Sequence, residues 1–100
     1  MTQEPPAPGR RAVRCRVGGR VQMVGFRFFA QQHAQRLGLR GWVRNTGSGE
    51  VEVVAEGEAG ELEEFLGWLR RGPESAQVTE VRVTELPPTA GLPAGFEVVS

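Results

Sequence analysis

The chain has 100 residues, no net charge and 39% hydrophobic residues, which fits one domain that folds around a single core without disulfides. Its one cysteine, Cys15, can form no internal bridge, and no apolar run is long enough to span a bilayer. We therefore expect a cytoplasmic protein and exclude a secreted disulfide scaffold. Charge is nevertheless uneven, because residues 1–44 hold nine arginines and one glutamate, whereas residues 45–100 hold three arginines and eleven glutamates. A basic half could bind nucleic acid, but we favour mutual neutralisation between strands of one sheet.

Apolar periodicity predicts two helices and five short strands. Residues 1–10 contain three prolines and no periodic apolar face, so we expect a disordered tail before a domain that spans residues 11–100. Val13, Cys15 and Val17 alternate with arginines, which is typical of a strand with one buried face. The other elements are expected as a helix over 26–37 capped by Gly38, strands over 42–46 and 50–56, a helix with apolar positions from 62 to 69 ended by Gly72-Pro73, and strands over 78–86 and 96–99.

This order, βαββαβ followed by a short extra C-terminal strand, predicts a ferredoxin-like α/β (α+β) sandwich in which both helices cover one face of an antiparallel sheet. A right-handed crossover makes the first two strands parallel, with the third strand between them. Their ends then lie at the same edge of the sheet. Arg27, just after the first strand, and Asn45, near the end of the second, are expected to face one pocket.

The segment Gly19–Arg27, with the sequence GRVQMVGFR, is expected to run from the first strand into the first helix. Free backbone N–H groups of a first helical turn, the positive end of the helix dipole and the guanidinium of Arg27 can converge there on a small anion such as phosphate. The glycines could instead only make a tight turn, with Arg27 as a solvated surface charge. This segment alone does not separate the two interpretations.

A second segment, Gly41–Glu50 with the sequence GWVRNTGSGE, separates them. At this spacing the two segments together resemble the acylphosphatase family, and the resemblance extends from about Val13 to the last strand. It implies a hydrolase that splits the carboxyl–phosphate bond of acyl phosphates into a carboxylate and inorganic phosphate. In that family the arginine that matches Arg27 holds the phosphoryl group, and the asparagine that matches Asn45 positions the attacking water.

The resemblance also implies a phosphate-binding loop and a simple set of partners. The loop comprises Gly19, Arg20, Val21, Gln22, Met23, Val24, Gly25 and Phe26. We expect a metal-independent monomer with no cofactor and no covalent nucleophile. Its partner would be a small-molecule acyl phosphate substrate, with no nucleic acid and no membrane.

Met23 departs from the family pattern, which usually has a second loop glycine at this position. If the loop needs a positive φ there, methionine costs about 1–2 kcal/mol; otherwise it only adds bulk beside the pocket. His33, on the apolar face of the first helix, and Cys15 are interpreted as core residues, and Trp42 and Trp68 as core or core-edge aromatics. One histidine and one cysteine without an acidic partner at ligand spacing argue against a zinc site.

Three alternatives stay open. RNA-recognition modules share the βαββαβ order, but they stack bases on aromatic residues of the central strands, and the acidic segment 50–56 has none. A regulatory domain could bind a small anion without turning it over. A third possibility is a relative of the acylphosphatase-like domain of a hydrogenase maturation protein that handles carbamoyl phosphate.

Overall fold

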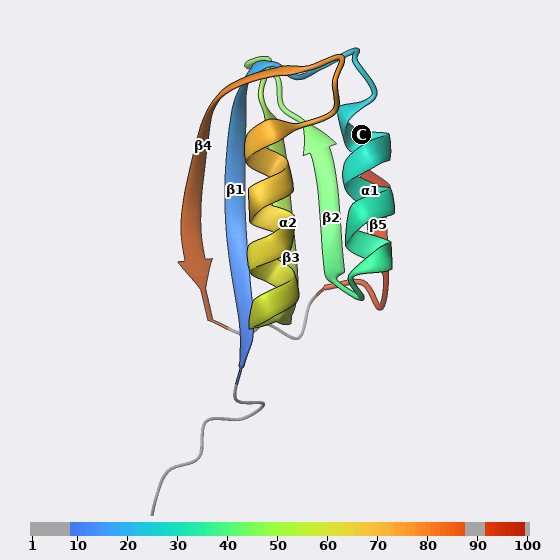
Figure 1. The fold of residues 1–100 in the computed structure, drawn as a ribbon, viewed down its shortest axis with the longest axis vertical. Helices are drawn as coiled ribbons and strands as arrows, with labels where there is room; N and C mark the ends of the chain where they lie inside the picture. Colours follow the sequence, from blue (N-terminus) through green and yellow to red (C-terminus); the bar gives the residue numbers. More distant parts are fainter. Residues whose placement is uncertain (1–8, 88–91, 100) are drawn as a thin grey trace, which may run out of the picture.

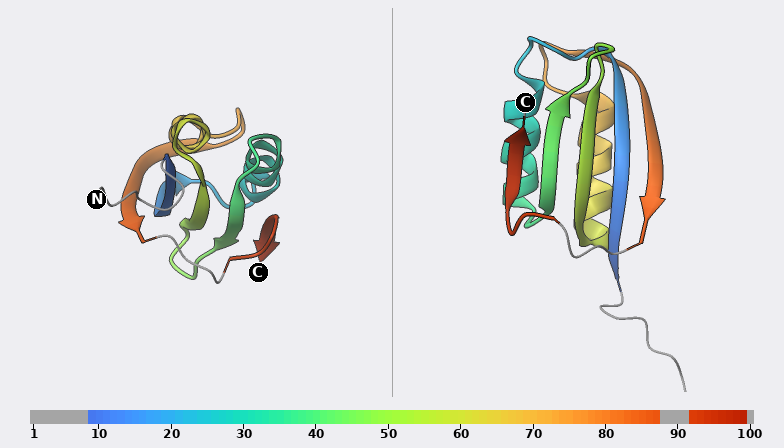
Figure 2. Two further views of the ribbon diagram at one scale, coloured as in Figure 1. Left: turned by 90° about the horizontal axis from the view of Figure 1, so that it is seen from below. Right: turned by 180° about the vertical axis from the view of Figure 1, so that it is seen from behind.

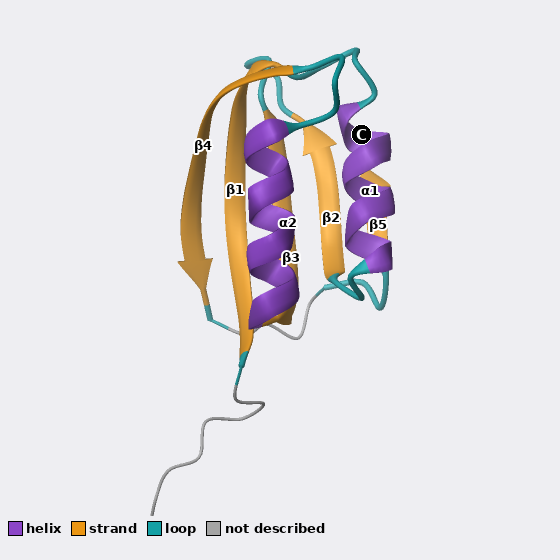
Figure 3. Cartoon of the chain, in the orientation of Figure 1, coloured by secondary structure: helices purple, strands orange, loops and turns teal. Residues whose placement is uncertain are grey.

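The computed structural model describes residues 9–87 and 92–99, which form two helices and one five-stranded sheet (Figures 1 and 3). The elements are β1 (Arg10–Arg20), α1 (Phe26–Arg36), β2 (Arg40–Asn45), β3 (Val51–Glu58), α2 (Ala59–Arg71), β4 (Gln77–Leu86) and β5 (Phe96–Val99). The expected tail lies outside the described residues except for Gly9 and Arg10, and Arg10 already begins β1. Neither described helix combines the length and apolarity needed to cross a membrane.

The strand order is β4-β1-β3-β2-β5. Both β1 and β2 pair antiparallel with β3 between them, so β1 and β2 run in the same direction and end at the same edge, as predicted. The antiparallel sheet is confirmed for β1 to β4, and the extra C-terminal strand, β5, pairs in parallel with β2. The parallel direction of β5 follows from the chain connection. β4 ends at the same end of the sheet as the start of β2, so β5, which begins from that end beside β2, runs in the same direction as β2 (Figure 1).

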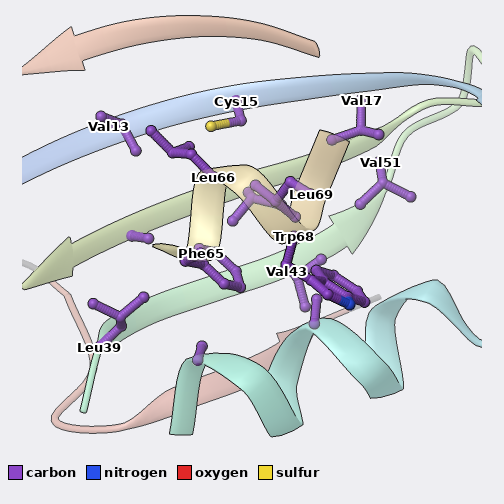
Figure 4. Close-up of a cluster of buried hydrophobic side chains, with 14 of the residues drawn as sticks. Val13, Cys15, Val17, Leu39, Val43, Val51, Phe65, Leu66, Trp68 and Leu69 are labelled. Carbon is purple, nitrogen blue, oxygen red and sulfur yellow. The ribbon is translucent and has the colours of Figure 1, made fainter. Parts of the chain in front are cut away.

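Both helices pack on one face of the sheet, and the core lies between the two layers (Figure 2). The alternate residues of β1 point into it, and Figure 4 shows Val13, Cys15 and Val17 turned toward α2. The apolar stripe predicted for α2 is fully buried, and burial of each leucine or phenylalanine contributes about 1.5–3 kcal/mol. The α2 stripe therefore packs directly on the inner face of the sheet.

Cys15 is a core residue, as expected, whereas His33 is only half-buried and packs at the edge of the core. Cys15 is fully buried, and burial raises the pKa of its thiol to about 12, which keeps it protonated and unreactive. The ring of His33 stacks on Trp68 with 4.6 Å between centroids, and its Nδ1 lies 2.8 Å from Nη2 of Arg36. Burial, and then the charge of Arg36, lower the pKa of His33. Trp68 is buried in the core, whereas Trp42 is half-buried on the open sheet face under Arg44.

The uneven charge along the chain is neutralised in space on the sheet face that carries no helix. Glu52 of β3 is only 6% exposed and pairs with arginines of both neighbouring strands, at 2.6 Å from Arg44 and 3.4 Å from Arg14. Glu50 likewise lies 3.0 Å from both Arg16 and Arg82. These ion pairs confirm the interpretation of mutual neutralisation between strands.

Candidate functional site

The site lies at the edge of the sheet where β1 and β2 both end. Here the segment 21–25, which links β1 to α1, lies beside the hairpin that follows β2 (Figure 1). A pocket of about 300 Å³ is lined by the loop, the first half of α1, the last residue of β2 and one residue of β5, and it brings Arg27 and Asn45 together. Its lining residues are Val21, Met23, Gly25, Phe26, Arg27, Phe28, Gln31, Asn45 and Val98.

The backbone of the β1–α1 loop leaves a run of amides without a backbone acceptor in the described residues. Met23 has φ 64°, and Gly25, the N-cap of α1, has φ 81° and ψ 12°. The first amide of the helix with a backbone acceptor is that of Phe29, which donates to the Gly25 carbonyl at 3.1 Å. Within the described residues, the amides of 22–28 have no backbone acceptor. Left-handed residues alternating with ordinary ones produce a concave nest of N–H groups that suits an anion.

Met23 is the only non-glycine residue with a positive φ in residues 9–87 and 92–99. This geometry decides the question that the sequence left open, because a left-handed conformation is where glycine is favoured over methionine. The side chain is 99% exposed and gains no packing in return. Met23 thus holds a strained conformation at the mouth of the pocket.

Side-chain hydrogen bonds fasten the loop on both sides. Nε2 of Gln22 donates to the carbonyls of Thr46 and Glu50, at 2.9 and 2.8 Å, and so joins the loop to the hairpin that follows Asn45. On the other side, Oγ of Ser75 donates to the Val24 carbonyl at 2.7 Å. Gln22 and Val24 therefore shape the loop without lining the pocket.

Gly19 and Arg20 belong to β1 and also lie outside the pocket lining. A β-bulge between Gly18 and Gly19 shifts the register with β4. Gly19 has φ 118°, and a Cβ there would collide with the carbonyl oxygen of Gln77, so glycine allows β4 to approach closely. Its visible role is to let strand pairing continue up to the start of the loop.

Arg27 lies in the first turn of α1, half-buried in the pocket wall. Its Nη1 donates to the Val99 carbonyl of β5 at 3.4 Å. None of the salt bridges among the described residues involves Arg27. The first turn contains no acidic residue and the N-cap makes no side-chain hydrogen bond, so the positive helix end and the guanidinium both face the pocket.

Asn45 is the last residue of β2, and its backbone pairs with Val51. Its side-chain Oδ1 is buried and has no hydrogen-bond partner within the described part of the chain. An unsatisfied buried acceptor costs about 1–3 kcal/mol, so the atom is suited to accept a hydrogen bond from a molecule that enters the pocket.

Three lining residues were missed by the sequence analysis: Phe28, Gln31 and Val98. Gln31 follows Arg27 by one helical turn, a spacing that places both on one face, and its Nε2 donates to the Phe96 carbonyl at 3.1 Å. Phe28 directly follows Arg27 and its exposure gives no periodic signal. Val98 reaches the site only because β5 pairs with β2.

Metal-ligand clusters are not found in the described residues, where no group of three or more His, Cys, Asp or Glu side chains is placed to hold a metal ion. The pocket instead offers a guanidinium, free backbone amides and an amide oxygen. These groups suit an oxyanion and a water molecule.

Comparison with known proteins agrees with this geometry. Residues 13–98 match the family model for acylphosphatase. An acylphosphatase from Rubrobacter xylanophilus is 50% identical over 86 residues, which cover 86% of this chain and 77% of the relative. The crystal structure of acylphosphatase from Bacillus subtilis superposes with a TM-score of 0.85 at 39% identity, covering 90% of this chain and 99% of that one.

A longer protein contains a similar unit. Full-length HypF, in its phosphate- and nucleotide-bound form, matches 97% of this chain with a TM-score of 0.79 and 27% identity, but the match covers only 13% of the HypF chain. The relatives of comparable length are thus the acylphosphatases. This chain belongs to the acylphosphatase family, whose members are hydrolases that act on acyl phosphates.

Proposed function

We propose that the pocket at the ends of β1 and β2 is where this acylphosphatase hydrolyses its substrate, with Arg27 and the loop amides holding the phosphoryl group and Asn45 positioning the attacking water. The observation that carries the proposal is the convergence in one pocket of an arginine, unpaired amides and the unpartnered Oδ1 of Asn45. Each group matches one requirement of the reaction.

The chemistry needs little beyond positioning and charge stabilisation. Phosphoryl transfer passes through a loose transition state with negative charge spread over the equatorial oxygens, which a guanidinium and backbone N–H groups stabilise. The water oxygen bonds to phosphorus as the bond from phosphorus to the acyl oxygen breaks, and the electron pair leaves with the carboxylate. Because the amide of Asn45 is no base, the proton of the water passes to a phosphoryl oxygen of the substrate.

The predicted loop residues Gly19–Phe26 contribute in two ways. Val21, Met23, Gly25 and Phe26 line the pocket and present the backbone to the phosphoryl group. The others hold the loop in shape, most directly Gln22 through its two hydrogen bonds to the hairpin. We infer that the whole segment acts as one phosphate-binding loop.

The proposal includes metal independence and no cofactor, because the donors of the pocket already supply the positive charge that a metal ion would provide. Activity is expected to be unchanged after exhaustive EDTA treatment and dialysis. Activity lost in EDTA and restored by Mg²⁺ or Zn²⁺ would contradict this part of the proposal.

We further propose a cytoplasmic monomer whose partner is a small acyl phosphate and not nucleic acid or a membrane. The open sheet face supports this proposal, since Glu50, directly before β3, and Glu52 of β3 hold arginines of this face in ion pairs. Arginines that are already paired with carboxylates are less available to the phosphates of a nucleic acid. Light scattering would test the monomer, and titration with single-stranded RNA would test for nucleic-acid binding.

One assay tests the central proposal. Purified protein is mixed with benzoyl phosphate, and hydrolysis is followed as a loss of absorbance against a blank matched for spontaneous decay. Turnover above the blank is expected. A protein that binds phosphate but shows no turnover would instead support the alternative of a small-anion-binding module.

A further inference from the structure

The mouth of the catalytic pocket is unusually apolar for a site that binds an anion. Among the described residues, the large hydrophobic side chains with substantial exposure are Met23, Phe28, Phe29 and Val98. Three of them, Met23, Phe28 and Val98, line this one pocket, with exposed fractions of 99%, 55% and 39%. They come from the loop, from α1 and from β5, so tertiary structure gathers them.

These side chains adjoin the proposed phosphoryl site. Phe28 directly follows Arg27, and Met23 lies within the run of free amides. Val98 belongs to the strand whose last carbonyl, that of Val99, receives the hydrogen bond from Arg27. A molecule whose phosphoryl group reaches Arg27 therefore extends its other end past this apolar rim.

Among the described residues that line the pocket, Arg27 is the only ionisable one. With Arg27 engaged by the phosphoryl group, a second anionic group on the substrate would find no cation in the lining. An uncharged apolar group would instead be removed from water against Met23, Phe28 and Val98. Both the single charge in the pocket lining and the apolar side chains at its mouth therefore favour an uncharged, apolar acyl group.

Met23 provides an independent indication. It combines a left-handed backbone conformation with an almost fully exposed side chain, so neither local conformation nor core packing accounts for methionine there. Strain that persists at a pocket mouth is associated with function. A flexible thioether suits an apolar surface that must adapt to acyl groups of different shapes.

We propose that Met23, Phe28 and Val98 form an acyl-group subsite, and that this chain favours acyl phosphates with uncharged, apolar acyl groups over those that carry a further negative charge. The proposal rests on the proposed function, because it assumes that the phosphoryl group is held at Arg27. It adds the substrate class that the same pocket selects.

The test compares three probes: benzoyl phosphate, acetyl phosphate and 4-carboxybenzoyl phosphate. In Phe28→Ser, the ratio of kcat/KM for benzoyl over acetyl phosphate is expected to fall about 10-fold, the lower end of what a hydrophobic pocket contributes to discrimination. The inhibition constant for inorganic phosphate should stay within about twofold, because the variant leaves Arg27 and the loop amides in place. Phe29→Ser, which changes a neighbouring exposed phenylalanine outside the pocket lining, should leave the ratio unchanged.

A gain of function sharpens the test. Phe28→Arg introduces a cation at the rim and should shift preference from benzoyl toward 4-carboxybenzoyl phosphate by about 10-fold or more. Unchanged ratios in both Phe28 variants, with normal turnover of the wild type, would overturn the subsite while leaving the proposed function intact. No turnover of any probe by the wild type would overturn both.

Discussion

The two helices begin in opposite ways. The first turn of α2 contains Glu61, and its N-cap is Glu58, so acidic side chains of the chain itself offset the positive end of the helix dipole. The first turn of α1 has no acid, its N-cap is the left-handed Gly25 without a side-chain cap, and it carries Arg27 instead. A cation at that end costs about 0.3–1 kcal/mol. The start of α2 serves stability, and the start of α1 is left ready for an anion.

The two helices also differ in the side chains that they bury. Along α2 the residues Leu62, Phe65, Leu66, Trp68 and Leu69 are all buried, as Figure 4 shows for several of them. Along α1 the buried residues are Phe26 and two alanines, and polar Gln31 fastens the helix to β5. Of the two helices, α2 therefore contributes more buried side chains to the core, while α1 carries residues of the site. The following experiments test this difference between the two helices.

The largest effect is expected from removing the cation that opposes the α1 dipole. Arg27→Gln should lower kcat/KM for benzoyl phosphate by at least about 10²–10³, the loss expected when one main transition-state donor is removed. Arg36→Gln removes the same charge from the opposite end of α1, outside the pocket, and should retain activity. Comparable losses in the two variants would mean that overall charge, and not the site, controls the rate.

Asn45→Ala should separate the binding of phosphate from the chemistry. Its Oδ1 is proposed to hold the water, so kcat should fall while the inhibition constant for phosphate stays nearly the same. Steady-state kinetics with phosphate as a competitive inhibitor measures both quantities. If the variant mainly raised the inhibition constant, the division of roles between Arg27 and Asn45 would be wrong.

Anions should stabilise the wild type through the start of α1 alone. Phosphate or sulfate at 100 times its Kd should add about 2.7 kcal/mol to the free energy of unfolding, and the melting temperature should rise accordingly. In Arg27→Gln this gain should largely vanish at the same anion concentration. Glu61→Gln, the control at the start of α2, should lower the melting temperature slightly and keep the full gain. Equal anion stabilisation of wild type and Arg27→Gln would place the anion elsewhere.

The smallest effect concerns the strained residue of the loop. Because Met23 has a φ of 64°, Met23→Gly should relieve about 1–2 kcal/mol of conformational strain in the folded state. This gain is partly offset by about 0.5–1 kcal/mol, because glycine gives the unfolded chain more conformational freedom. The net change is a modest stabilisation, measurable by chemical denaturation. Glu74→Gly, at an exposed loop position with an ordinary φ, should destabilise the protein instead. Destabilisation by both variants would show that Met23 carries no strain.

Local pattern was sufficient to predict much of this protein. The alternating apolar residues of β1 and the apolar stripe of α2 predicted a strand and a helix. Each must bury one face, and apolar residues recur along the chain with the period of that face. The predicted order of the elements, which places the ends of the first two strands at one edge of the sheet, predicted that Arg27 and Asn45 share a pocket. Even Gly38 has the predicted left-handed conformation, since its lack of a side chain permits it without any tertiary contact.

Other features depend on contacts between distant segments, and only the tertiary structure decided them. β1 continues to Arg20 because the register shift at Gly18 and Gly19 lets it keep pairing with β4. β5 runs parallel to β2 because both strands start at the same end of the sheet. The same pairing brings Val98 into the pocket. The left-handed Met23 arises where the loop is fastened by Gln22 and Ser75 at once. The spacing of apolar residues in one segment shows which face of that helix or strand is buried. Which strands pair and which conformation a loop adopts depend on contacts with segments far away in the sequence.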